Sequence, residues 1–150
     1  MNESLPTWME RAIRGEYVED YELKSYVWKH YKHALTEREQ ALHLAATLEL
    51  KARLASTEAT AAKLRHMPGY FCDAEVAAIA ETGLGAFEQQ CCQRLLHDHA
   101  DHIYINRCER CHRIVASPIA CACLWCHHHW YERRSEMVAR STSDIYPTRK

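Results

Sequence analysis

The sequence predicts a mainly α-helical protein with a small β segment: a long antiparallel helical hairpin, then a cysteine-rich β ribbon and a short helix. Three observations support this fold class. Only four of the 150 residues are Gly and four are Pro, which disfavours an all-β fold. Apolar residues recur at helical spacing through the first hundred positions. Two Cys-x2-Cys pairs then lie in a β-prone stretch at residues 103–131.

The two cysteine pairs predict a metal site. They are Cys108-x2-Cys111 and Cys123-x2-Cys126, separated by eleven residues. A two-residue spacer lets the chain turn tightly and direct two thiolates at one ion, and the second pair completes a tetrahedron. We therefore expect a zinc ribbon with one structural zinc ion. All four ligands come from the protein, so no coordination position is open for hydrolytic chemistry.

Other donors near this site leave alternatives. Cys121 could replace Cys123, and His112 or the run His127–His129 also offers soft donors. The four chosen cysteines are preferred because both pairs then have the same spacing. If Cys121 is not a ligand, we expect it to be a small apolar side chain in the ribbon core.

Three further histidines follow the predicted hairpin, and two of them share a helix face. A second metal is one interpretation. Histidines at a helix C-terminus also interact favourably with the helix dipole, which needs no metal, and we favour that interpretation. The residues are His97, His99 and His102.

The helices are predicted from caps and periodicity. A capping box at Thr7 opens a short helix that Gly15 ends, and Val27, Tyr31 and Leu35 mark an amphipathic helix. Residues 36–65 lack Gly and Pro and contain a coiled-coil-like seam of small residues, with a second capping box at its start. The seam comprises Leu42, Ala45, Leu48, Ala52, Ala55, Ala59 and Ala62.

The second half of the predicted hairpin begins after a break at His66–Tyr70. Asp73 is a good N-cap, and an apolar stripe follows, weakened by two glycines that favour a kink. The stripe comprises Val76, Ala80, Leu84, Phe87, Cys91 and Leu95, with Cys91 expected to be buried. The predicted domains are 1–102, helical with the hairpin tip near 67–73, then 103–140, ribbon plus short helix, and 141–150, a flexible tail.

Composition suggests a cytoplasmic protein. The N-terminus has acids where a signal peptide has a basic region, and no run approaches the roughly 18 apolar residues of a spanning helix. In a reducing compartment, eight cysteines indicate metal binding or buried thiols before disulfides. We therefore expect no membrane association.

The charge is distributed unevenly, which suggests a partner. Residues 1–102 have 11 Lys and Arg against 16 Asp and Glu, and residues 103–150 have 8 against 4. The basic ribbon could bind nucleic acid through arginines on phosphates and an aromatic ring on a base. The alternatives are a protein partner docked on the hairpin and a homodimer through the alanine-rich seam. The candidate nucleic-acid residues are Arg107, Arg110, Arg113, Trp130, Arg133 and Arg134.

The order of hairpin, ribbon and C-terminal helix is similar to that of the DksA/TraR family of transcription regulators. The stretches Cys108–Cys111, Ala116-Ser117-Pro118 and Cys123–Cys126 resemble that family's finger. In those proteins the hairpin enters a channel of RNA polymerase, so the resemblance implies a polymerase-binding regulator.

No catalytic motif accompanies these features. The chain has no GxSxG, P-loop, dinucleotide-binding or HExxH motif, and no cysteine pair of the deaminase type preceded by proline. We expect a non-enzymatic regulator or adaptor without catalytic residues. Two alternatives are a zinc-dependent enzyme, if Cys121 and a histidine leave one coordination position open, and a redox sensor that releases zinc when its thiolates oxidise.

Overall fold

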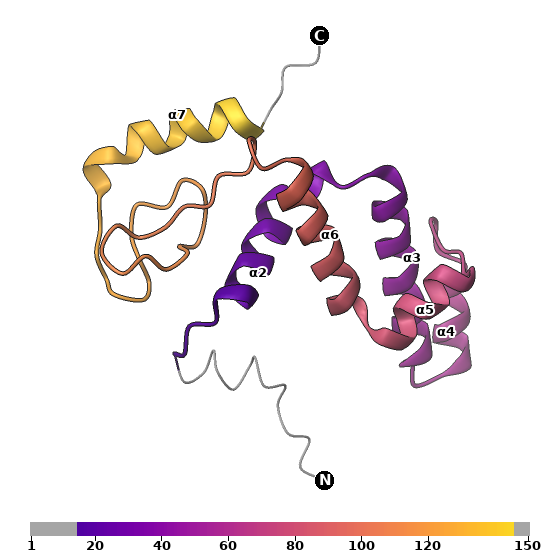
Figure 1. Ribbon diagram of the computed structural model, residues 1–150. Coiled ribbons are helices and arrows are strands. Elements are labelled where there is room, and N and C mark those ends of the chain that lie inside the picture. Colours follow the sequence, from indigo (N-terminus) through magenta and orange to yellow (C-terminus); the bar gives the residue numbers. More distant parts are fainter. Residues whose placement is uncertain (1–14, 146–150) are drawn as a thin grey trace. The chain divides into compact units, whose positions relative to one another are not determined.

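The computed structural model describes residues 15–145, and side chains as far as residue 140. It divides into two compact units, one made of residues 34–98 and the other of residues 15–33 with 99–145. The described chain is mainly helical, as predicted (Figure 1). The short helix predicted from Thr7 lies outside the described residues.

The unit of residues 34–98 contains four α-helices, and α4 and α5 both pack against α3. Its core cluster joins the inner face of α3 to α5, with Leu42, Ala45 and Ala46 packed beside Val76 and Ile79. The helices are α3 (Glu37–Arg53), α4 (Glu58–Arg65), α5 (Ala74–Thr82) and α6 (Leu84–Asp98).

The capping box at Thr36 begins α3, so this helix starts anew after the short 3-10 turn η1 (Lys32–Ala34). The Thr36 hydroxyl accepts a bond from the Glu39 amide at 3.1 Å, and the Glu39 carboxylate accepts one from the Thr36 amide at 2.8 Å. These bonds satisfy two amides that the first turn would otherwise leave unpaired. The predicted cap is confirmed.

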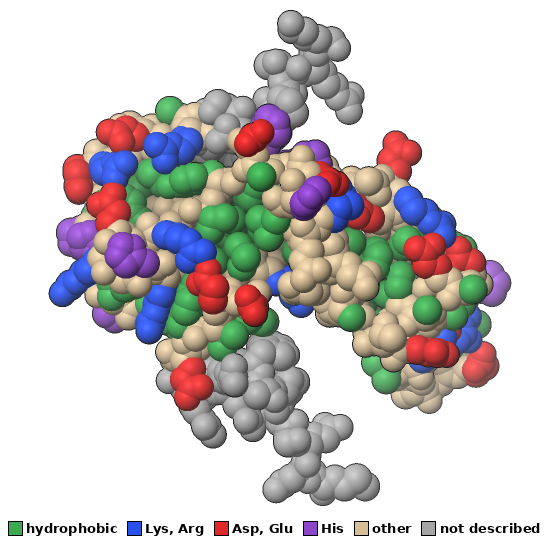
Figure 2. Space-filling model, in the orientation of Figure 1, with side chains coloured by type: hydrophobic (Ala, Val, Ile, Leu, Met, Phe, Trp, Pro, Cys, Tyr) green, Lys and Arg blue, Asp and Glu red, His purple; other side chains and the backbone are tan. Residues whose placement is uncertain are grey.

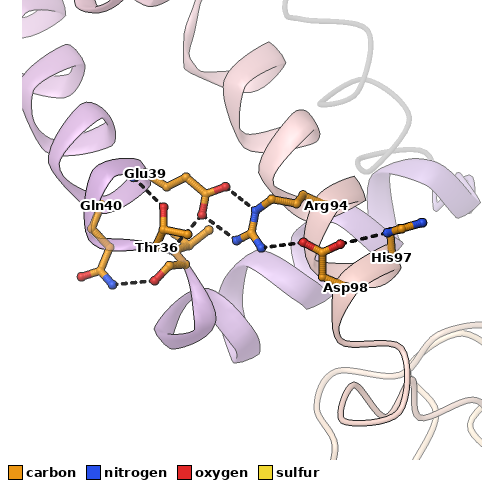
Figure 3. A network of polar contacts seen from close by, with 7 residues as sticks. Thr36, Glu39, Gln40, Arg94, His97 and Asp98 are labelled. Atoms are coloured by element: carbon orange, nitrogen blue, oxygen red, sulfur yellow. Dashed lines mark hydrogen bonds and ion pairs between the residues drawn. The ribbon is translucent and has the colours of Figure 1, made fainter.

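Glu39 also joins α3 to α6 (Figure 3). Both of its carboxylate oxygens accept bonds from the Arg94 guanidinium at 2.6 Å, and Arg94 also reaches Asp98 at 3.2 Å. Burial alone would raise the pKa of Glu39, but the hydrogen bonds from Arg94 lower it below its ordinary value. This bidentate pair fixes the register of the two helices.

The long hairpin is not formed, and the prediction of one helix over 36–65 is wrong. α3 ends at Arg53 and α4 begins at Glu58, with Thr57 as N-cap accepting a bond from the Thr60 amide at 3.2 Å. Because α4 turns back on α3, Arg65 reaches the carboxylate of Glu49 at 3.3 Å. Arg53 reaches the same carboxylate from within α3, but the bonds from Arg65 and the Tyr70 hydroxyl form only if the chain folds back, which a straight helix would prevent.

The first four positions of the alanine-rich seam are covered within their own unit. Leu42, Ala45, Leu48 and Ala52 are each no more than 5% exposed. A second copy could not pack on these side chains unless the unit opened. Ala55 and Ala62 are half-buried and Ala59 is exposed, so the homodimer predicted through this seam would have to use its second half.

The predicted stripe of the next segment and its kink are found. Asp73 caps α5 by accepting a bond from the Val76 amide at 2.8 Å. Gly83 lies between α5 and α6 and has φ +94°. Glycine adopts this conformation without strain, whereas other residues rarely do, so the helix ends here. Cys91 is 2% exposed, as expected, and burial raises its pKa to about 12.

The other unit contains α2 (Glu19–Tyr31), the cysteine-rich segment, the 3-10 turn η2 (Tyr131–Arg133) and α7 (Arg134–Ile145). The helix predicted after Tyr131 is present and continues to Ile145, inside the stretch predicted as tail. Residues 15–33 group with the cysteine-rich segment and not with residues 34–98, so the units differ from the predicted division at 102.

The expected β ribbon is reduced to two isolated bridges within the described residues, Arg107 with Ile114 and Ala122 with His129. Tyrosine hydroxyls from the N-terminal part form hydrogen bonds with backbone N–H and C=O groups that would pair with each other in a sheet. The Tyr26 hydroxyl donates to the Tyr104 carbonyl at 2.8 Å, and the Tyr17 hydroxyl accepts from the Ile114 amide at 3.0 Å. These bonds replace a ladder between strands.

The surface of the face drawn in Figure 2 mixes charges of both signs, with hydrophobic side chains exposed between them. In the part of the chain that the structure describes, no helix has both the length and the apolar character needed to cross a bilayer.

Candidate metal centre

The two Cys-x2-Cys turns have the same backbone conformation, fifteen residues apart. In each, the first cysteine's amide donates to the carbonyl five residues later, and its carbonyl accepts from the amide four residues later. The first turn has Cys108 N to Arg113 O at 2.9 Å and His112 N to Cys108 O at 2.8 Å. The second has Cys123 N to His128 O at 2.8 Å and His127 N to Cys123 O at 3.0 Å.

These two knuckles bring the four predicted thiols together. The sulfur atoms of Cys108 and Cys126 are 3.6 Å apart, as are those of Cys111 and Cys123, and all four lie within 4.8 Å of one another. Four sulfurs each ~2.3 Å from a tetrahedral zinc would be about 3.8 Å apart. The cysteines therefore fit a zinc ion, and among residues 15–140 they are the only such cluster of three or more donors.

The site lies in the core of its unit. Cys108 and Cys123 are at most 2% exposed and pack with Val115, Trp130 and Met137. Burial and the neighbouring thiols raise the pKa of Cys111 to about 12. A zinc ion binds the thiolate form of cysteine, so metal binding at Cys111 would release a proton.

The alternative donors do not join this cluster. Cys121 is 7% exposed and its sulfur lies 3.5 Å from the Ile119 carbonyl, in the same apolar core, as expected for a residue that is not a ligand. The rings of His128 and His129 lie against Trp130 and Tyr131, respectively. The imidazole of His97 is 88% exposed and contacts Asp98 at 2.9 Å, and no cluster of donors is found there among the described residues.

One N-terminal residue, Tyr17, supports the knuckles in a way that cysteine spacing does not indicate. Tyr17 packs edge-on against Trp125 with ring centroids 5.2 Å apart. The guanidinium of Arg113 lies over both rings, 5.3 Å from that of Tyr17 and 5.6 Å from that of Trp125. The indole of Trp125 donates to the Ile114 carbonyl at 3.3 Å. These contacts hold the second knuckle against residues near the first.

A buried asparagine organises the loop between the knuckles. Asn106 is 1% exposed, and its amide nitrogen donates to the carbonyls of Ser117 and Ala120, both at 2.9 Å. Its own backbone amide donates to the Tyr26 hydroxyl at 3.2 Å. The only sequence signal for this role is an asparagine inside a β-prone run, where asparagine is uncommon.

The residues proposed for nucleic acid lie in different environments. Trp130 is 3% exposed and belongs to the core, so a base could not stack on it. Arg107 is paired with Glu19, and Arg133 with Glu109. Arg113 is held by the aromatic pair described above. Arg110 and Arg134 are exposed, and no ion pair involves either one within the described part of the chain.

Each knuckle ends in a histidine with a left-handed backbone, His112 at φ 60° and His127 at φ 59°. Glycine is strain-free there and a β-branched residue is not. We expect His112→Val to lower the free energy of unfolding by about 1–2 kcal/mol. His112→Gly should change it by no more than about 0.5 kcal/mol. Thermal unfolding of the zinc-loaded protein measures both.

The matched control is His102→Val, because His102 is also exposed but has no positive φ. It should be neutral. Equal destabilisation by the Val and Gly variants at residue 112 would mean that the imidazole itself matters and that the backbone conformation does not.

No family model, curated protein or solved structure matches this chain in comparisons with known proteins. The likeness to the DksA/TraR family therefore remains a prediction from the order of elements and the cysteine spacing.

Proposed function

We propose that this chain is a non-enzymatic zinc-binding protein, a regulator or adaptor whose zinc ion has a structural role. The observation that supports the proposal most directly is the tetrad of thiols, with cross-knuckle sulfurs 3.6 Å apart. Zinc held by four protein sulfurs has no position for water or substrate. When bound, the ion would cross-link the two knuckles and stabilise the fold around them.

The chain's own residues would then act by presenting a surface. Neighbours of the site, including Cys121 and the imidazoles of His128 and His129, pack or stack and do not approach the sulfurs as a fifth donor would. A polymerase-binding role of the DksA/TraR kind would need a long hairpin. The break between α3 and α4 removes that basis, so the proposal does not include it.

A nucleic-acid partner would have to use the basic residues that are not already paired. Arg110 and Arg134 fit this requirement. We expect the double change Arg110→Glu and Arg134→Glu to weaken binding to oligonucleotides of every sequence. The slope of log K against log salt should fall by about 1.4 on a single strand or 1.8 on a duplex, since two phosphate contacts are lost. Fluorescence anisotropy across a salt series measures this.

The matched control is Lys51→Glu with Lys63→Glu, which makes the same change in net charge on the other unit, at two exposed positions. It should leave the slope unchanged. If the parent protein binds neither oligonucleotide in 50 mM salt, or if both double variants reduce the slope equally, the basic ribbon is not a specific nucleic-acid surface and a protein partner remains.

A further inference from the structure

A groove of about 380 Å³ lies within the zinc-containing unit, between α2 and the knuckles. One wall is a face of α2, and the other includes Val115 and Trp125. Leu124 stands at the rim with 74% of its surface exposed. None of these side chains belongs to the metal site, and the structural role of zinc gives the groove no function.

The wall from α2 has its charges at opposite ends. Glu22, Ser25, Tyr26 and Lys29 follow the spacing i, i+3, i+4, i+7 and therefore share one helix face. Glu22 and Lys29 are about 10.5 Å apart along the axis. No ion pair involves either one within the described residues. Burial raises the pKa of Glu22, so its carboxylate is partly withdrawn from water without a cation to compensate.

The second knuckle has an apolar tip where the first has a charged one. By the fifteen-residue repeat, Leu124 corresponds to Glu109, and Trp125 to Arg110. Both knuckles make the same backbone hydrogen bonds although their tip residues differ, so the knuckle conformation does not require a leucine at residue 124. An exposed leucine beside an apolar groove is typical of a contact surface.

We propose that two copies of this chain associate about a two-fold axis through the groove, with Glu22 of each copy opposite Lys29 of the other and both Leu124 side chains in the shared apolar contact. Ser25 lies about midway between Glu22 and Lys29. If the two α2 helices run antiparallel and cross beside Ser25, the Glu22 end of each helix therefore lies opposite the Lys29 end of the other. The small side chain of Ser25 lets the helices approach.

A second copy is the occupant that this surface fits, because the surface contains its own complement. A two-fold interface uses the same patch on both subunits, so each charge in it needs the opposite charge within that patch. Glu22 and Lys29 meet this condition on one helix face. Leu124 supplies the protruding apolar group, and the groove supplies the hollow.

Sedimentation equilibrium of the zinc-loaded full chain tests the proposal. We expect a monomer–dimer equilibrium, with Leu124→Asp raising the dimer Kd by at least about 30-fold. Glu22→Lys and Lys29→Glu should each raise it about tenfold, since each places like charges opposite one another at two symmetric positions. The double variant Glu22→Lys with Lys29→Glu should return to within about threefold of the parent, because the pairs are restored with reversed sign.

The control is Arg110→Asp, which places an aspartate at the tip of the other knuckle and should leave the dimer unchanged. Zinc content and circular dichroism establish that each variant is folded. A chain that stays monomeric at several hundred micromolar overturns the proposal. So does a dimer that survives Leu124→Asp, or a charge-reversed double variant that is no tighter than its single variants.

Discussion

Replacing Cys108 and Cys126 by serine should abolish zinc binding and unfold residues 103–130, while residues 34–98 keep their helices. A serine hydroxyl is a poor zinc ligand, and a segment of about 30 residues cannot bury enough surface to fold alone. The core around the site includes the ligands themselves, so losing the metal also loosens the packing of Val115 and Trp130. Elemental analysis and amide hydrogen exchange measure the two effects.

The loss should extend to α2, since Tyr26 holds the backbone of Tyr104 and Asn106. Circular dichroism should therefore show a partial loss of helix. Cys72→Ser is the matched control, because Cys72 is exposed and lies outside the cluster, and it should retain one zinc per chain. Zinc retained in the double variant would contradict the assignment. So would an oxygen or nitrogen donor in the X-ray absorption spectrum, which would reopen the question of catalysis.

The cluster of four cysteines was predictable from the sequence because the geometry of each cysteine pair is local. Each knuckle is set by a two-residue spacer and a backbone turn, so spacing alone selects Cys108, Cys111, Cys123 and Cys126 over Cys121. The same holds for helix starts. The caps at Thr36 and Asp73 depend on residues three positions away and are found as expected.

What spacing could not predict depends on residues far apart in the chain. The support of the knuckles by Tyr17 and Tyr26 spans 97 and 78 positions, respectively. Trp130 next to a basic run suggested an exposed stacking ring, but the small cysteine-centred core needs a large apolar side chain and buries it. Periodicity also favoured a continuous helix through residue 65. The spacing of apolar residues carries no information about the hydrogen-bond partners of a buried carboxylate.

That carboxylate belongs to Glu49, and Glu49→Ala should lower the free energy of unfolding of residues 34–98 by about 2–3 kcal/mol. The side chain is 7% exposed and accepts bonds from Arg53 at 2.9 Å, from Arg65 at 3.3 Å and from the Tyr70 hydroxyl at 2.8 Å. Removing it takes this acceptor from the guanidinium groups of Arg53 and Arg65, whose side chains are each 37% exposed, and from the Tyr70 hydroxyl. Urea unfolding followed by circular dichroism measures the change.

The effect should depend on pH with a definite sign. The hydrogen bonds from Arg65, and then those from Arg53 and Tyr70, outweigh burial and lower the pKa of Glu49 from 4.5 to about 2. A carboxyl group with a lowered folded-state pKa stabilises the fold above its unfolded pKa, and that contribution is lost as pH falls from about 5 toward 2. The parent should therefore lose stability across this range, and Glu49→Gln, which has no charge to titrate, should lose less.

A second carboxylate serves as a control, because it also pairs with an arginine but does not lie between α3 and α4. Glu75 also bonds an arginine, Arg38 at 2.7 Å, but its carboxylate is 56% exposed. Glu75→Gln should change stability by less than about 1 kcal/mol, because water replaces the lost bond. If Glu49→Gln is equally mild and has the parent's pH profile, Glu49 does not hold α4 against α3. The break at residues 54–57 would then have to be explained by the Thr57 cap alone.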